Sequence, residues 1–185
     1  MNTGAIASRY AKALLKYTEQ TGGGRLVCDQ SVTIGKSMAE SPRLMQILED
    51  PVRVEEKEKL TLLQSALGKD AMADELVRFV RLVIKHGRIE FLRLMLHSFT
   101  SQYYAANNIT TAQLTTAGQV EGLDDKVKAF VKEKTGKDVI LSSKMDPSII
   151  GGFVFTIDDY RIDASISHQL EIIKRQFVEK NRRII

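Results

Sequence analysis

The stretch DPSIIGGFVFTIDDYRIDASISHQLEIIKRQF, residues 146–177, decides which fold the sequence can form. Its first half is rich in β-branched and aromatic residues and is punctuated by Asp-Pro, Gly-Gly and Asp-Asp pairs. This composition predicts two strands joined by a turn at 158–160. The second half predicts a helix over about 164–180. The apolar residues of that helix recur at spacings of four, three and four, which places them on one face: Ile166, Leu170, Ile173 and Phe177.

A mixed pattern already begins upstream of this stretch, at Asn107-Asn108. The segment ITTAQLTTA, residues 109–117, is rich in threonine and predicts a strand. A helix is expected over 121–134, and DVILSS, residues 138–143, predicts a further strand. Together with the closing stretch, these elements predict a small mixed α/β domain over residues 107–185.

The region before it, residues 1–106, reads as helices. Apolar residues recur there at helical spacing, and glycine or proline marks the end of each run. The fold class is therefore α+β, an N-terminal six-helix bundle followed by the small α/β domain. The fifth helix carries apolar residues around most of its circumference, which predicts a central position. The six helices are expected over about 3–21, 25–40, 42–48, 55–67, 71–86 and 89–106.

The composition of the 185 residues is that of an ordinary soluble protein, with 43% apolar and 27% charged residues. The single cysteine, Cys28, cannot form an internal disulfide, which suits a reducing compartment. No window approaches 18 consecutive apolar residues, and the first 15 residues do not resemble a secretory signal. We therefore expect a cytoplasmic protein.

Catalytic or metal-binding constellations do not emerge from the sequence. An enzyme needs converging acids, bases, nucleophiles or metal ligands. The three histidines, His86, His97 and His168, lie in different segments. Gly35-Lys36-Ser37 resembles the end of a phosphate-binding loop, but Gln30 stands where that motif needs its first glycine. We expect no catalytic residue, no metal and no cofactor, and interpret the chain as a binding or structural component.

The net charge of +4 and the pI of about 9.1 leave a second interpretation open. A helical adaptor that binds nucleic acid or another protein would also be basic. Against nucleic acid, the basic residues are interleaved with acidic ones and form no strip with aromatic residues. An enzyme with an unrecognised site is the third possibility, and turnover by the pure chain would reveal it.

Three stretches resemble one known family. ASRYAKALLKYT, residues 7–18, is similar to the first helix of the ATP synthase delta subunits, the bacterial relatives of the mitochondrial oligomycin-sensitivity-conferring protein. VRFVRLVIKHGRIEFLRLMLHSF, residues 77–99, resembles their fifth and sixth helices, and residues 146–177 resemble their C-terminal region. Two departures occur: Ala164 stands where the family commonly has glycine, and residues 167–169 are Ser-His-Gln where it commonly has basic residues.

This resemblance implies a stator subunit without catalysis in a rotary proton-translocating ATP synthase. The helical domain, residues 1–106, would bind the N-terminal helices of the alpha subunits in the catalytic head. The small domain, residues 107–185, would contact the b subunits of the peripheral stalk. The protein would lie at the cytoplasmic face of the bacterial plasma membrane and touch the membrane only through the complex, without nucleic acid or cofactor.

The resemblance also implies partner-binding residues. In this family the first and fifth helices form the walls of a groove for a partner helix. Apolar side chains anchor a helix in such a groove. The matching positions are Ala7, Tyr10, Ala13, Leu14, Phe79, Leu82 and Val83. Periodicity alone does not separate core from interface, although Tyr10 and Ala13 favour the groove. For the last helix we expect most of the apolar face to pack on the sheet. Phe177 and the basic end would contact the stalk: Lys174, Arg175, Lys180, Arg182 and Arg183.

Overall fold

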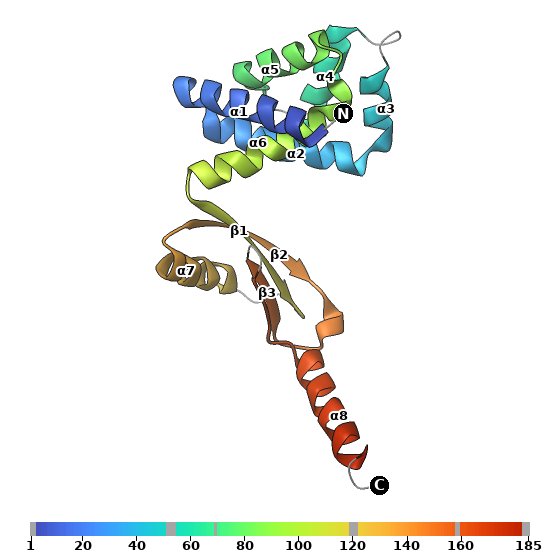
Figure 1. The fold of residues 1–185 in the computed structure, drawn as a ribbon, viewed down its shortest axis with the longest axis vertical. Coiled ribbons are helices and arrows are strands. Elements are labelled where there is room, and N and C mark those ends of the chain that lie inside the picture. Colours follow the sequence, from blue (N-terminus) through green and yellow to red (C-terminus); the bar gives the residue numbers. More distant parts are fainter. Residues whose placement is uncertain (1–2, 51–54, 69, 119–121, 158–159, 183–185) are drawn as a thin grey trace. The chain divides into compact units, whose positions relative to one another are not determined.

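The computed structural model describes residues 3–50, 55–68, 70–118, 122–157 and 160–182 (Figure 1). Within these ranges it contains eight α-helices and one four-stranded mixed sheet, which confirms the predicted α+β class. The chain divides into two compact units, residues 1–106 and residues 107–185. The turn expected at 158–160 falls largely outside the described residues.

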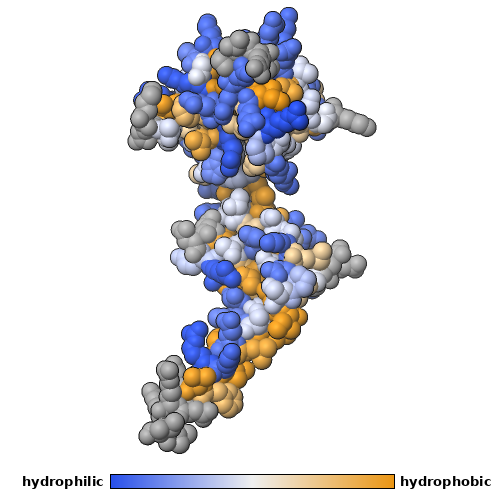
Figure 2. Space-filling view, turned by 90° about the vertical axis from the view of Figure 1, so that its right-hand side faces the viewer, coloured by the Kyte–Doolittle hydropathy of each residue, from blue (hydrophilic) through white to orange (hydrophobic). Residues whose placement is uncertain are grey.

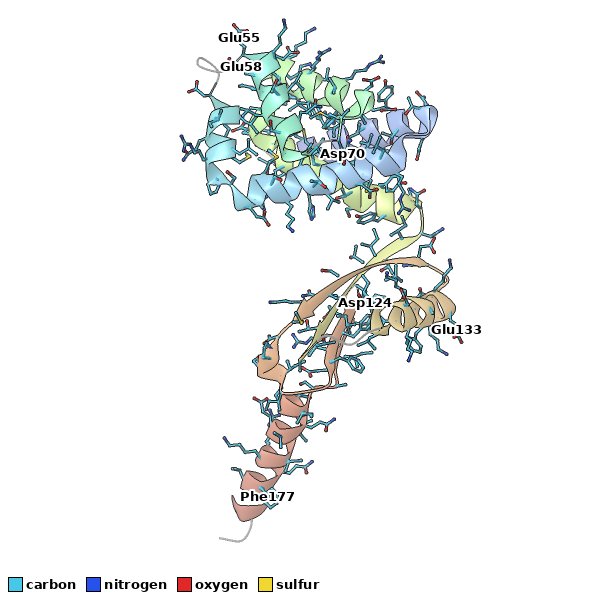
Figure 3. The ribbon with its side chains drawn as sticks, turned by 180° about the vertical axis from the view of Figure 1, so that it is seen from behind. Glu55, Glu58, Asp70, Asp124, Glu133 and Phe177 are labelled. Carbon is cyan, nitrogen blue, oxygen red and sulfur yellow. The ribbon has the colours of Figure 1, made fainter. Side chains whose placement is uncertain are left out.

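The first unit is built from helices with short connections. Its second helix ends where Ser41 and Pro42 interrupt it, because proline is accepted in the first turn of a new helix but not inside an old one. Its fourth helix begins with a capping box between Glu55 and Glu58, which are labelled together in Figure 3. The elements are α1 (Thr3–Thr21), α2 (Gly24–Glu40), α3 (Pro42–Glu49), α4 (Glu56–Ala66), α5 (Asp74–Lys85), a 3-10 turn η1 (Ile89–Phe91) and α6 (Leu92–Ala106).

One hydrophobic core holds these helices together. Both α1 and α2 pack against α6, and each helix contributes the residues of one face. The predicted central helix, α5, is amphipathic rather than buried all round, because Leu82 is exposed and Val77 and Ile84 are only partly buried. The largest side chains that are fully buried in this core are Ile34, Met38, Leu48, Leu63, Leu76, Leu92, Met95, Leu96 and Phe99.

A buried glutamine sets the start of α5. The side chain of Gln30 donates to the Ala71 carbonyl oxygen and accepts from the Ala73 amide, both at 2.8 Å. These two bonds hold residues 71–73 outside the helix, so α5 begins at Asp74 and not at Ala71 as the sequence predicted. The correction has a tertiary cause, because Gln30 lies on α2.

The second unit is a sheet with strand order β2-β1-β3-β4. Strands β1 and β2 are parallel and are joined through α7, whereas the β1–β3 and β3–β4 pairs are antiparallel. A parallel pair requires such a crossover, and a helix commonly supplies it. The elements are β1 (Ile109–Thr116), α7 (Leu123–Thr135), β2 (Asp138–Met145), a 3-10 turn η2 (Pro147–Ile149), β3 (Phe153–Ile157), β4 (Tyr160–Asp163) and α8 (Ile166–Arg182).

The core of this unit is small and one-sided. Val131 of α7 packs with Ala112, Leu114 and Phe155 of the sheet. Strand residues alternate between faces, so the intervening positions of β1 point to the other face. There Thr111 and Gln113 are exposed and polar. Within the described residues, the sheet is therefore covered by a helix on one face, where α7 lies beside it (Figure 1).

The apolar face of α8 does not pack on the sheet, which corrects the sequence-based expectation. Figure 1 shows α8 leading away from the end of the strands. Periodicity identifies residues that share a helix face, but it does not tell what covers that face. The four stripe residues are all exposed: Ile166 by 44%, Leu170 by 52%, Ile173 by 49% and Phe177 by 66%.

Candidate functional site: two exposed helix faces

Tyr10 joins α1 to α5 and to the turn that follows α5. Its ring meets the ring of Phe79 edge to face, with 6.3 Å between the centroids. Its hydroxyl accepts a hydrogen bond from Nη1 of Arg88 at 2.8 Å, and the guanidinium carbon lies 5.5 Å from the centre of the ring. Tyr10 is only partly buried, so this aromatic and cationic contact lies at the surface of the unit.

A second tyrosine makes an equivalent link further along the two helices. Nη1 of Arg78 donates to the hydroxyl of Tyr17 at 2.9 Å. Beyond it, a hydrogen bond from Thr21 lowers the pKa of Glu75. Ascending positions on α1 thus meet descending positions on α5, which means that the two helices run antiparallel.

Two exposed apolar side chains lie between the tyrosine links. Ala13 is three residues after Tyr10 and four before Tyr17, and Leu82 is one turn after Arg78. Because the helices are antiparallel, Ala13 and Leu82 lie at a similar level along the two helices, between the Tyr10–Arg88 and Tyr17–Arg78 hydrogen bonds. Leu82 is 45% exposed, and Ala13 is exposed as well. We call this surface, formed by Tyr10, Ala13, Tyr17 and Leu82, the α1–α5 face.

The remaining residues predicted for this site lie beneath it. Four of them belong to the hydrophobic core of the unit: Ala7, Leu14, Phe79 and Val83. They fix the two helices from below and are not available at the surface. Sequence reasoning did not single out Tyr17, Arg78 or Arg88 for the site. Helical spacing from the predicted residues could have found Tyr17 and Arg78. It could not have found Arg88, which follows the end of α5 at Lys85.

The surroundings of the α1–α5 face are basic. Arg9 lies one turn before Ala13, and Arg78 and Lys85 flank Leu82 on α5. All three side chains are exposed. An apolar strip bordered by cations complements a helix that carries acidic residues beside its apolar anchors.

The second exposed face is the apolar stripe of α8, and its base is held firmly. Ser165 caps the helix by accepting from the His168 amide at 3.2 Å, and Asp163 accepts from the Ser165 hydroxyl at 2.6 Å and from its amide at 3.1 Å. These bonds lower the pKa of Asp163. A Cβ on Gly152 would lie 2.2 Å from the Ala164 carbonyl oxygen, so only glycine permits this approach.

The stripe itself has the spacing of a helix that packs on another helix. Ile166, Leu170, Ile173 and Phe177 recur at four, three and four, the alternation of a heptad seam. Figure 2 shows apolar side chains gathered along one side of α8, and Figure 3 shows Phe177 pointing away from the helix near its end. The side chains of Lys180, Arg182 and Arg183 lie outside those that the structure describes.

Within the described ranges, neither unit brings together side chains that could form a catalytic or metal-binding site. No three His, Cys, Asp or Glu residues there could hold a metal ion together. Burial raises the pKa of Cys28 to about 11, which keeps its thiol protonated and poorly nucleophilic. None of the helices in the described part of the chain is long and apolar enough to cross a membrane.

Two exposed helix faces, each on a rigid base, are the features of a protein that connects other proteins. The chain belongs to the ATP synthase delta (OSCP) subunit family, whose model matches residues 6–177. It is 39% identical over 186 residues to the ATP synthase subunit delta of Phocaeicola vulgatus, and all of both chains is covered. It is 29% identical over 180 residues to that of Lactobacillus acidophilus, covering 95% of this chain and 96% of the relative.

The fold also matches a solved structure. A chain of the Toxoplasma gondii mitochondrial ATP synthase hexamer superposes with a TM-score of 0.62 at 15% identity, covering 94% of this chain and 97% of that one. At 15% identity, this structural similarity shows a shared fold and nothing more. Family membership confirms the sequence-based prediction of a non-catalytic stator subunit of ATP synthase.

Proposed function

We propose that the chain ties the catalytic head of the synthase to its peripheral stalk, one partner on each unit. The helices of residues 1–106 act as a six-helix bundle that presents the α1–α5 face to an N-terminal helix of an alpha subunit. The unit of residues 107–185 presents α8 to the b subunits of the stalk. In the bacterial cell this places the protein at the cytoplasmic face of the plasma membrane.

The two exposed apolar side chains of the α1–α5 face, Ala13 and Leu82, support the proposal that this face binds a helix of an alpha subunit. Leu82 and Ala13 lie over a floor of buried residues, between the Tyr10–Arg88 and Tyr17–Arg78 hydrogen bonds. The hydrogen bonds and the core beneath hold both helices in place before a partner arrives. A preorganised face loses little entropy on binding, which suits a contact that must hold under torque.

Titration calorimetry with a synthetic N-terminal helix of the cognate alpha subunit tests this role. We expect the wild-type chain to bind and Leu82→Asp and Ala13→Asp to lose on the order of thirtyfold or more in affinity, because each buries a charge in an apolar contact. Leu94→Asp is the matched control, since Leu94 on α6 is 49% exposed and Leu82 is 45% exposed. Failure of the folded wild-type chain to bind would refute the assignment of the alpha subunit to this face.

A further inference from the structure

Ile150 has a backbone conformation that isoleucine rarely adopts. It follows η2 with φ at 66° and ψ at −42°. The Gly151 amide donates to the Ile149 carbonyl oxygen at 2.7 Å, which closes a γ-turn with Ile150 at its centre. A β-branched side chain is strained in this region because its branches crowd the backbone.

The fold of the second unit gains nothing visible from this side chain. Ile150 is 64% exposed and lies outside the hydrophobic cluster of α7 and the sheet. Its neighbour Ile149, by contrast, is only 8% exposed. Glycine would adopt the same conformation without steric cost. An exposed, strained and apolar residue indicates a benefit that arises outside the free chain.

Ile150 lies beside the start of the α8 stripe. The Cδ1 atom of Ile166 lies 2.6 Å from the place of a Cβ on Gly151, so its side chain covers the residue next to Ile150. The Ile166 amide also donates to the Gly151 carbonyl oxygen at 3.0 Å. The γ-turn and the first turn of α8 are thus fixed to each other, and Ile150 is the neighbour of the residue that the first stripe residue covers.

The spacing and the charge of the last segment indicate what covers this surface. A stripe at spacings of four, three and four matches one partner helix in a left-handed coiled coil. Residues 166–185 hold five basic residues, Lys174, Arg175, Lys180, Arg182 and Arg183, against two acidic ones, Glu171 and Glu179. Charge complementarity therefore favours a helix with acidic residues beside its apolar seam.

We propose that Ile150 is an anchor for one acidic amphipathic helix that lies along α8. The strained γ-turn holds the side chain out, and the partner helix buries it together with Ile166 and Leu170. The inference rests on the proposed function, in which a helix of the peripheral stalk is this partner.

A set of full-length variants, titrated with the soluble helical segment of the cognate b subunit, tests the inference. Ile150→Gly removes both the strain and the side chain, so we expect an unfolding midpoint about 4 °C higher and affinity on the order of tenfold weaker. Ile150→Thr keeps the branched Cβ but not the apolar surface, so it should weaken binding without the rise. Ile172→Ala is the control, because Ile172 is 41% exposed on α8 but lies off the stripe.

The outcomes separate the two levels of the proposal. If Leu170→Asp abolishes binding while both Ile150 variants bind like wild type, stalk binding stands and the role of Ile150 is overturned. If none of the three variants affects binding, both ideas fall. A lower unfolding midpoint for Ile150→Gly would overturn the strain argument, and self-association of the wild-type chain through α8 in place of stalk binding would assign the stripe to a second copy.

Discussion

The helical unit, residues 1–106, and the mixed unit, residues 107–185, treat their large apolar side chains in opposite ways. Among the described residues, the exposed large apolar side chains of the first unit are Leu26, Val32, Leu82 and Leu94. Those of the second unit are Phe130, Ile140, Met145, Ile150, Phe153, Tyr160, Ile162, Ile166, Leu170, Ile172, Ile173, Phe177 and Val178. The first unit thus buries most of its large apolar side chains, whereas the second unit leaves many of them exposed.

This difference separates two kinds of binding surface. The first unit has a complete core, so a partner adds contacts to a fold that is already stable. The second unit has a core of four buried residues, Ala112, Leu114, Val131 and Phe155, and a long uncovered helix. Such large uncovered apolar area marks an interaction site. We infer that a partner contributes far more to the stability of the second unit than to that of the first.

Amide hydrogen exchange with and without the stalk segment measures this contrast directly, and the effect is the largest that we expect. A ligand at a hundredfold excess over its Kd stabilises the bound state by about 2.7 kcal/mol. Exchange from α8 and the sheet should therefore slow by about a hundredfold, while the core amides of α2 and α6 should be unaffected.

The alpha-subunit helix provides the reciprocal control. It should slow exchange in α1 and α5 only modestly, because those helices are already held by the Tyr10–Arg88 bond and by the core. Equal protection of both units by either partner would contradict the contrast.

The two hydrogen bonds that the buried Gln30 side chain makes to Ala71 and Ala73 test whether the first unit is stable without a partner. Gln30→Ala leaves the Ala71 carbonyl and the Ala73 amide without their partner, and we expect a loss of about 2 kcal/mol in unfolding free energy. Urea denaturation followed by circular dichroism measures it, with the exposed Gln20→Ala as the matched control. The stalk affinity should not change. If the unfolding free energy falls by the same amount in Gln30→Ala and in the control, the two Gln30 hydrogen bonds are dispensable.

The same Gln30 hydrogen bonds show which part of the fold could not be predicted from the sequence. Helix ends at Pro42 or Gly136 were predictable because proline and glycine act locally on the backbone. The start of α5 was not predictable, since Gln30 competes for the backbone from 41 residues away. Likewise, the periodicity of α8 correctly predicted that its apolar residues share one helix face, but only the structure shows that the sheet does not cover that face.

The candidate site divides in the same way. The family resemblance, and not spacing, implied that Tyr10, Ala13 and Leu82 line a groove between two helices, and the structure leaves Ala13 and Leu82 exposed. Spacing could not tell that Phe79 is buried, nor that arginines reach across to two tyrosine hydroxyls. Those bonds depend on the antiparallel register of α1 and α5, which the sequence does not state. The partners of both faces therefore stay predictions.

The cap of α8 gives a smaller test, confined to the second unit. Ser165→Ala removes the acceptor of the His168 amide, and the loss of a helix cap costs about 1 kcal/mol. We expect lower thermal stability and faster exchange in the first turn of α8, with α1 unaffected. Ser142→Ala, an exposed serine on β2, is the control. If the two variants are equally stable, the rigid base of α8 does not depend on this cap.

The buried thiol of Cys28 gives the smallest test, confined to the first unit. Burial raises its pKa from 9.0 to about 11, so the folded chain keeps the proton at a pH where the unfolded chain releases it. The stabilising contribution is therefore full below pH 9 and is lost as the pH rises toward 11. At pH 9 the loss is about 0.4 kcal/mol. Urea titrations from pH 7 to 9.5 should show a shallower decline for Cys28→Ala than for wild type. Parallel declines would mean that the thiol ionises alike in both states, and the core around α2 would then be more open to water than its buried side chains indicate.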